Sequence, residues 1–189
     1  MPARKGKLLK QPAISAKERI EKSEDVTQTE NAWSRGKPGE LRPTATKRTA
    51  ISVHMESPKK SDISTIHTHL IEKAGHGYSA PSIGDMLSFI AEIKKSNIRT
   101  LHVATINAKG EMIGYVSLHA TPHAVELIIK KSYEPVLSLP GMFKVNDSTP
   151  DANRAALRRA KEALEKDGYS LHIKPMPGYE FKNWKFVKK

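Results

Sequence analysis

The 189-residue chain contains no cysteine, and only 6% of its residues are aromatic. The absence of cysteine excludes disulfide bonds, thiolate zinc sites and a cysteine nucleophile, so any metal ion must be held by nitrogen and oxygen atoms. Apolar runs are short and interrupted, so we expect no membrane-spanning segment. The N-terminus lacks the apolar stretch of a secretory signal, and we therefore expect a cytoplasmic protein.

Acidic residues are fewer than basic ones: 20 Asp and Glu stand against 32 Lys and Arg, which gives a formal net charge of +12. Such a charge attracts polyanions over a Debye length of roughly 8–10 Å, so nucleic acid and acidic proteins are both candidate partners. A solubilising basic tail explains the charge equally well. No RNP, zinc-finger or helix-turn-helix signature indicates a dedicated nucleic-acid module.

The basic residues are dense at the N-terminus, where few apolar residues accompany them. Such a segment buries too little apolar surface to offset the entropy of ordering it, so we predict a basic flexible tail over residues 1–24. A short helix around 16–23 would be marginal on its own. The remaining length, residues 25–189, is enough for one domain with a real core.

The periodicity of that domain predicts strands and helices in mixed order, which is typical of an α+β (mixed α/β) fold. Apolar residues at helical spacing and a following Gly168 predict the long C-terminal helix. The run 125–129 fits a strand or a short helix. We expect strands at 26–34, 49–55, 63–70, 101–106, 112–118, 171–173 and 181–187, and helices at 82–97 and 151–166.

The most informative motif is a His-x-His pair, His67 and His69, followed by Ser82-x-x-Asp85. Residues two apart in a strand share a face, so both imidazoles would point the same way. Two imidazoles and one carboxylate are the ligands of an open zinc site that leaves its fourth position to water. A simpler explanation also exists, because Ser-x-x-Asp before an apolar run resembles a helix capping box.

The order His67-Thr-His69, then Pro81-Ser82-Ile83-Gly84-Asp85 at the start of a helix, resembles the motif of the JAMM (JAB/MPN) zinc metalloprotease family. Two features depart from that motif: Leu70 stands where the family usually has proline, and the gap to Ser82 is longer. The resemblance implies a central β-sheet flanked by helices, with Zn²⁺ bound by His67, His69 and Asp85. It implies that the domain at 25–189 hydrolyses peptide or isopeptide bonds in protein substrates such as ubiquitin-like conjugates.

The family also has an upstream glutamate that acts as general base, and we assign this role to Glu30. Glu40 is the alternative, although its neighbours Gly39 and Pro43 are typical of a loop, and Glu56 lies too close to the histidines. The resemblance further implies that the Ser82 hydroxyl donates a hydrogen bond to the tetrahedral oxyanion.

Two other functions remain open at this point. A catalytically silent member of the same fold would serve as a binding scaffold. A nucleic-acid-associated protein would use its basic tail and its Lys-rich C-terminus for nonspecific contacts, with a metal site that is incidental or acts on phosphodiesters. The substrate, the cleaved linkage, the partner subunits and the oligomeric state are not predicted by any motif.

Overall fold

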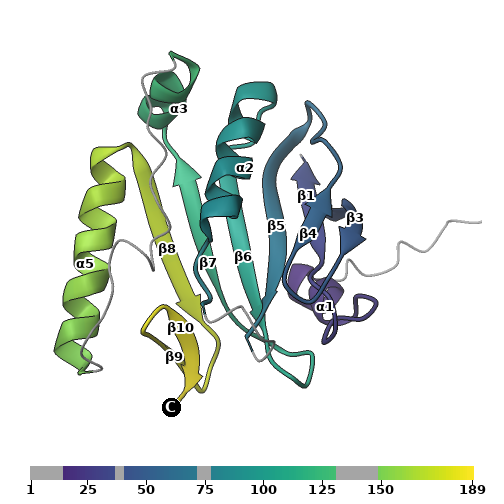
Figure 1. Ribbon diagram of the computed structural model, residues 1–189, viewed down its shortest axis with the longest axis vertical. Coiled ribbons are helices and arrows are strands. Elements are labelled where there is room, and N and C mark those ends of the chain that lie inside the picture. Colours follow the sequence, from purple (N-terminus) through teal and green to yellow (C-terminus); the bar gives the residue numbers. More distant parts are fainter. Residues whose placement is uncertain (1–14, 37–40, 72–77, 131–148) are drawn as a thin grey trace, which may run out of the picture.

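The computed structural model describes residues 15–36, 41–71, 78–130 and 149–189. Its centre is a six-stranded mixed sheet in the order β2-β1-β5-β6-β7-β8, in which β5 and β6 are parallel and all other neighbours are antiparallel. The fold is therefore α+β with helices against a mixed sheet, as the sequence predicts (Figure 1). The strands of this sheet are β1 (Ala32–Gly36), β2 (Leu41–Pro43), β5 (Asp62–Leu70), β6 (Thr100–Ile106), β7 (Met112–Ala120) and β8 (Tyr169–Pro175).

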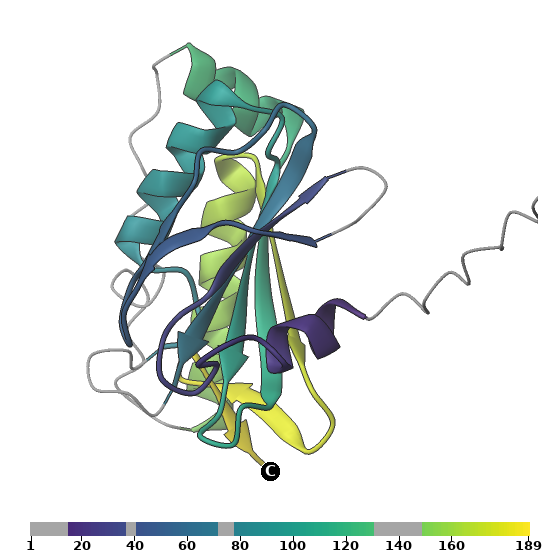
Figure 2. The same cartoon turned by 90° about the vertical axis from the view of Figure 1, so that its right-hand side faces the viewer.

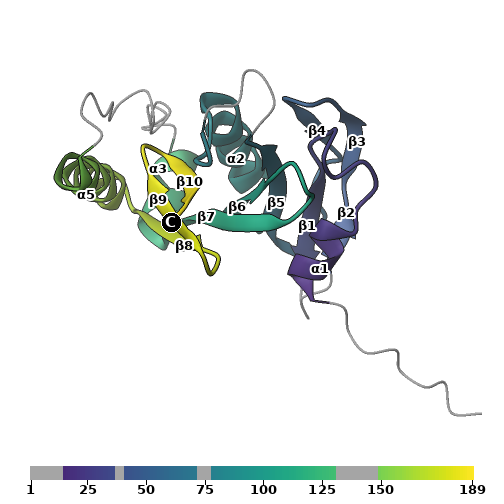
Figure 3. The same ribbon diagram turned by 90° about the horizontal axis from the view of Figure 1, so that it is seen from below.

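Helices α2 (Ile83–Lys95), α3 (Pro122–Ile129) and α5 (Pro150–Lys166) bury their apolar stripes in one core on a single face of the sheet (Figures 1 and 3). Phe89 and Met86 of α2 are almost completely buried there. A C-terminal hairpin of β9 (Tyr179–Lys182) and β10 (Lys185–Lys188) adds Phe186 to the same core. This core is the larger of two and fixes α2 in front of β5 and β6.

The second face carries a smaller core under α1 (Ala16–Glu21), whose Ile20 is only 3% exposed. Ile20 packs in a cluster with Trp33 and Ile66, and Glu21 accepts a hydrogen bond from the backbone N–H of Met112 at 2.8 Å. The sequence assigns residues 15–24 to the flexible tail, whereas the structure packs α1 against the sheet (Figure 2). Tertiary contacts of Ile20 stabilise a helix that would be marginal alone. Residues 1–14 of the predicted tail lie outside the described residues.

The strand predicted over 26–34 is wrong in its first half, because residues 22–29 form turns and β1 begins only at Ala32. Asp25 adopts a left-handed conformation, with φ of 53°, and its carbonyl accepts the N–H groups of Gln28 and Thr29. The strand predicted over 49–55 is shorter as well. It is the second arm, β4 (Val53–Met55), of a hairpin whose first arm is β3 (Ala45–Arg48).

The other elements follow the sequence closely. The strand predicted at 63–70 is β5, and the paired strands predicted at 101–106 and 112–118 are β6 and β7. The ambiguous run 125–129 is part of α3. The single strand predicted over 181–187 is instead a hairpin, since Asn183 and Trp184 both have positive φ.

Helix α5 ends where the sequence predicts. Gly168 has a φ of +80°, and a Cβ atom at this position would lie 2.7 Å from the backbone nitrogen of Ala124. Only glycine fits both the conformation and the space. Among the described residues, no helix has the length and apolarity required to cross a membrane.

Candidate metal centre

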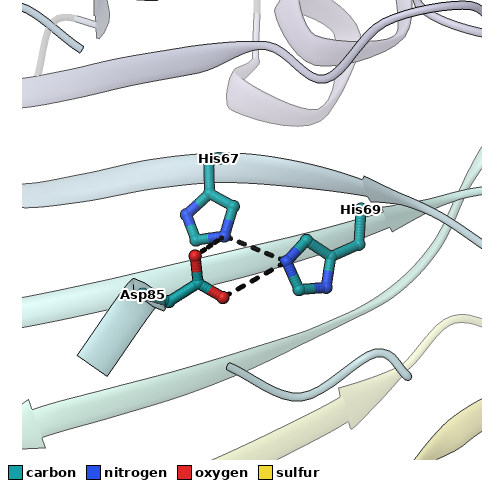
Figure 4. A group of neighbouring side chains, drawn as sticks. All are labelled: His67, His69 and Asp85. Atoms are coloured by element: carbon teal, nitrogen blue, oxygen red, sulfur yellow. Dashed lines mark hydrogen bonds and ion pairs between the residues drawn. The ribbon is translucent and has the colours of Figure 1, made fainter. Parts of the chain in front are cut away.

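His67 and His69 lie two residues apart on β5 and point to the side of the sheet that α2 covers, where Asp85 projects from the first turn of that helix (Figure 4). The Nε2 atoms of the two histidines are 3.1 Å apart. One carboxylate oxygen of Asp85 lies 3.2 Å from His67 Nε2, and the other lies 3.4 Å from His69 Nε2. The structure thus brings together the three ligands that the sequence predicts.

The spacing of these atoms fits a tetrahedral metal ion. Ligands at zinc bond lengths of 2.0–2.1 Å in a tetrahedron are roughly 3.3–3.4 Å from one another. The two Nε2 atoms are 3.1 Å apart and Asp85 Oδ1 is 3.2 Å from His67 Nε2, so these two separations lie close to that edge length; the 3.4 Å contact of His69 Nε2 is with the other oxygen of Asp85, Oδ2. Both histidines are at least 96% buried, so little of either imidazole is exposed to bulk water. His67, His69 and Asp85 can therefore hold a metal ion.

Groups outside the triad orient two of its members. The Nδ1 atom of His69 lies 3.1 Å from the backbone carbonyl oxygen of Tyr78, so a proton on Nδ1 is bonded there and Nε2 keeps its lone pair for a metal. Asp85 is held by a capping box: the backbone N–H of Ser82 donates to Asp85 Oδ2 at 2.6 Å, and the Asp85 N–H donates to Ser82 Oγ at 3.2 Å. The structure therefore contains the helix capping box that is the simpler explanation of Ser82-x-x-Asp85. This capping box also positions Asp85 in the triad.

Charge coupling within the triad is strong. Burial raises the pKa of the Asp85 carboxyl, but His67 and His69 outweigh that effect and hold it well below its usual range. Burial lowers the pKa of His67, whereas the Asp85 carboxylate raises it, and the net direction is upward. Asp85 is therefore ionised and ready to act as an anionic ligand at neutral pH.

Glu30 lies just before β1 and lines the same cleft as the triad, with a side chain that is only 3% exposed. Burial is the main reason that the pKa of Glu30 is raised to about 7. His69 lowers this pKa and Asp85 raises it, so both residues lie within electrostatic range of the Glu30 carboxyl. The sequence predicts Glu30 inside a strand; the structure places it in the turn ahead of that strand, beside the triad.

The backbone around Glu30 is fixed by its neighbour Asn31. The Asn31 N–H donates to Thr68 Oγ1 at 2.8 Å, and the Asn31 carbonyl accepts the Thr68 N–H at 2.9 Å. Thr68 stands between the two histidines, so this pair of bonds ties Glu30 to the strand that carries the metal ligands. Arg48 donates to Asn31 Oδ1 at 2.7 Å, and the N–H of Glu30 donates to the Thr49 carbonyl at 2.8 Å.

The site lies in a cleft of about 590 Å³ between α2 and the segment 51–58, which contains β4. Glu92 and Lys95 line the far end of this cleft, and Glu56 lines the side formed by that segment. Glu92 accepts a hydrogen bond from Thr65 Oγ1 at 3.3 Å, and burial raises its pKa to about 7. No sequence motif points to Glu92, although its position two helical turns after Asp85 places both carboxylates on one face of α2.

Two of the predicted features cannot be placed. Glu40, the alternative to Glu30, lies outside the described residues, as does the loop at 72–77 that lengthens the gap before Ser82. Ser82 itself lines the cleft. No family model, curated protein or solved structure matches this chain.

Proposed function

We propose that this protein is a zinc-dependent hydrolase that cleaves peptide or isopeptide bonds, with Glu30 as general base. One observation carries the proposal: a buried carboxyl, Glu30, shares a cleft with a His67–His69–Asp85 triad whose spacing suits a tetrahedral ion. A metal-ligand triad and a separate carboxyl are the minimum equipment for metal-assisted hydrolysis. The resemblance of these residues to the JAMM motif supports the same assignment.

Zinc is the metal that this donor set favours. Two imidazole nitrogens and one carboxylate leave a fourth position open, as in catalytic rather than structural zinc sites. When bound at such a site, zinc lowers the pKa of water to about 7 and polarises a carbonyl oxygen. The remaining chemistry is supplied by side chains of the chain itself.

Glu30 acts as the proton carrier. Its carboxyl takes a proton from the attacking water and later returns it to the departing amine, so one residue serves as base and then as acid. A pKa of about 7 suits both roles at neutral pH, since neither protonation state is strongly disfavoured. The hydrogen bonds of Asn31 to Thr68 keep the carboxyl at a fixed distance from the ligand strand.

Ser82 stabilises the oxyanion. Its Oγ accepts the N–H of Asp85, and its own hydroxyl hydrogen remains to be donated toward the cleft that Ser82 lines. A hydrogen bond to a developing oxyanion contributes about 3 kcal/mol to transition-state stabilisation in comparable enzymes. Ser82 therefore has two roles, since it also caps α2.

The substrate is an extended segment of a protein chain. The cleft is long, extends along α2 from Asp85 to Lys95, and is bordered by polar side chains at both ends. A helix rises about 1.5 Å per residue, so this part of α2 spans about 15 Å, the length of about four or five extended residues. Substrates of the ubiquitin-like class follow from the resemblance to the JAMM family.

The test is hydrolysis by zinc-loaded protein of a panel of fluorogenic peptides and isopeptide-linked ubiquitin-like conjugates. Glu30 and Glu56 line the same cleft, so Glu30→Gln and Glu56→Gln make the same chemical change at two positions in it. We expect Glu30→Gln to bind zinc normally but to lose activity by about 10²–10⁴-fold, the usual contribution of a general base. Glu56→Gln should keep wild-type activity.

Two results would contradict the proposal. Wild-type activity of Glu30→Gln would remove Glu30 from the reaction. Zinc-loaded wild-type protein without activity on any member of the panel would favour a scaffold that uses the triad only for stability.

A further inference from the structure

In the part of the chain that the structure describes, a helix covers the face of the sheet opposite α2, α3 and α5 at one end. Among the described elements, α1 alone lies on this side, and it packs near β1 and the turn end of β6 and β7 (Figures 2 and 3). The rest of the face, across β6, β7 and β8, has no helix over it in Figure 3. An apolar sheet face in this position would be unstable in water, so its composition is informative.

Strand register shows which residues share this face. His102 of β6 pairs with Ser117 of β7, and Ser117 pairs with His172 of β8, so the three form one row across the sheet. Residues paired in this way point to the same side. The adjacent rows are Ala104–Tyr115–Lys174 and Ser64–Thr100–His119–Ser170, and Arg35 of β1 extends the second of them. We call this set of residues the open sheet face.

Flat rings gather at its centre. The Tyr115 ring lies 6.4 Å from the His102 ring and 6.3 Å from the His172 ring, measured between centroids. Tyr115 is partly exposed and His172 is exposed. Ser117 Oγ lies 2.6 Å from His102 Nδ1, so the His102 ring is held in place and cannot rotate freely. The rings form a fixed cluster with accessible surface.

Charge on this face has one sign. Arg35 and Lys174 are exposed at opposite sides of the ring cluster, and β6, β7 and β8 contain neither Asp nor Glu. This absence is notable in a chain with 20 acidic residues. The metal centre lies on the other side of the sheet, so a partner bound here would leave the cleft open.

We propose that the open sheet face binds single-stranded nucleic acid, with bases against Tyr115 and His172 and phosphates against Arg35 and Lys174. Each base has an aromatic surface that stacks on side-chain rings without regard to sequence, and an open sheet of this width holds two or three bases. A face whose strands β6, β7 and β8 carry basic side chains and no carboxylates complements the phosphate backbone. This role is independent of hydrolysis at the metal centre.

The experiment is a fluorescence polarisation titration of the full chain with a labelled 20-nucleotide oligothymidylate, at 50 and 200 mM NaCl. We expect Tyr115→Ala to weaken binding about tenfold, which is typical of losing one base–aromatic stack, while Tyr115→Phe keeps the ring and retains the affinity. Arg35→Ala/Lys174→Ala should reduce the slope of log K against log salt by about 1.4, since each single-strand phosphate contact contributes about 0.7.

Two controls separate this face from other basic regions. Arg158→Ala/Lys161→Ala removes the same charge from α5, on the opposite side of the sheet. This variant should keep the wild-type slope of log K against log salt and should weaken binding less than Arg35→Ala/Lys174→Ala does. Neutralising the basic N-terminal residues should leave the tenfold effect of Tyr115→Ala intact. The N-terminal variant carries Arg4→Ala, Lys5→Ala, Lys7→Ala and Lys10→Ala.

An oligomer of abasic sites carries the same charge without bases, and we expect it to bind more weakly and to be insensitive to Tyr115→Ala. His172→Ala, at an exposed position, repeats the test if Tyr115→Ala unfolds the protein. The proposal is overturned if the oligothymidylate does not bind at 50 mM NaCl. It is also overturned if the abasic strand binds equally well, or if only the N-terminal substitutions reduce binding.

Discussion

Replacing Glu30 with glutamine should make the metal-free protein more stable while it removes activity. Glu30 is 3% exposed, and burial raises its pKa from 4.5 to about 7. An acid whose pKa is higher in the folded state destabilises that state when it ionises. The contribution of Glu30 to stability is therefore fully present below pH 4.5 and is lost as the pH rises through about 7.

The magnitude follows from the shift of the Glu30 pKa. One pKa unit corresponds to about 1.4 kcal/mol, so a rise from 4.5 to about 7 costs about 3 kcal/mol once Glu30 is fully ionised. At pH 5 only about 1 kcal/mol of this cost is present. Glutamine has the same shape and no charge, so Glu30→Gln should gain about 3 kcal/mol over wild type at pH 8.5 and about 1 kcal/mol at pH 5. For a chain of this length, 3 kcal/mol corresponds to a rise of about 6–12 °C in Tm.

The assay is urea unfolding of both proteins in the presence of a chelator, at pH 5 and pH 8.5. Glu56→Gln is the control, since Glu56 lies in the same cleft but is exposed, and its stability should follow wild type at both pH values. If Glu30→Gln and wild type unfold at the same urea concentration at pH 8.5, Glu30 is not held as a desolvated carboxyl. Glu30 would then be an ordinary ionised carboxylate at neutral pH and not a proton carrier.

Three further substitutions test other parts of the structure by urea unfolding. Asn31→Ala removes the acceptor of the Arg48 guanidinium and should lower the free energy of unfolding by about 1–3 kcal/mol. The control is Gln28→Ala, at an exposed position in the same loop, which should change the free energy of unfolding by no more than about 0.5 kcal/mol. Ser82→Ala removes the N-cap of α2 and should lower the free energy of unfolding by about 1 kcal/mol. Its zinc content should not change, because the backbone N–H at position 82 still binds Asp85. Loss of zinc would show that the hydroxyl is needed to position Asp85. Burial lowers the pKa of His102 from 6.5 to about 4, so its contribution to stability is fully present above pH 6.5. Up to about 3 kcal/mol of this contribution is lost as the pH falls toward 4. His102→Gln should therefore lose less stability than wild type over that range, and equal losses would show that His102 is not a buried neutral imidazole.

The sequence predicts the grouping of His67, His69 and Asp85 because it depends largely on local rules. Residues two apart on a strand share a face, and that rule alone places His67 beside His69. A polar residue before an apolar helical stripe predicts the N-cap at Ser82, and the cap in turn orients Asp85. What the sequence does not contain is the distance between the strand and the helix. Parallel pairing of β5 with β6, a contact between residues far apart in the chain, fixes that distance.

Glu30 shows where such local rules stop. Its position upstream of the histidines predicts Glu30 as the general base, within a predicted strand. It instead follows a left-handed turn at Asp25 and is held by Asn31 and Thr49, and none of these contacts follows from hydrophobic periodicity. Helix α1 is predicted only as a marginal helix within a flexible tail for a similar reason, since its stability depends on burying Ile20 against distant strands.

The most direct test of the account is the zinc content of purified protein by plasma mass spectrometry. Wild type is compared with His67→Ala/His69→Ala, and with His119→Ala/His123→Ala, which removes two exposed histidines elsewhere. We expect about one zinc per chain in the wild type and in the control, and none in the His67/His69 variant. Absence of zinc from the wild type after supplementation, or its retention in the His67/His69 variant, would contradict it.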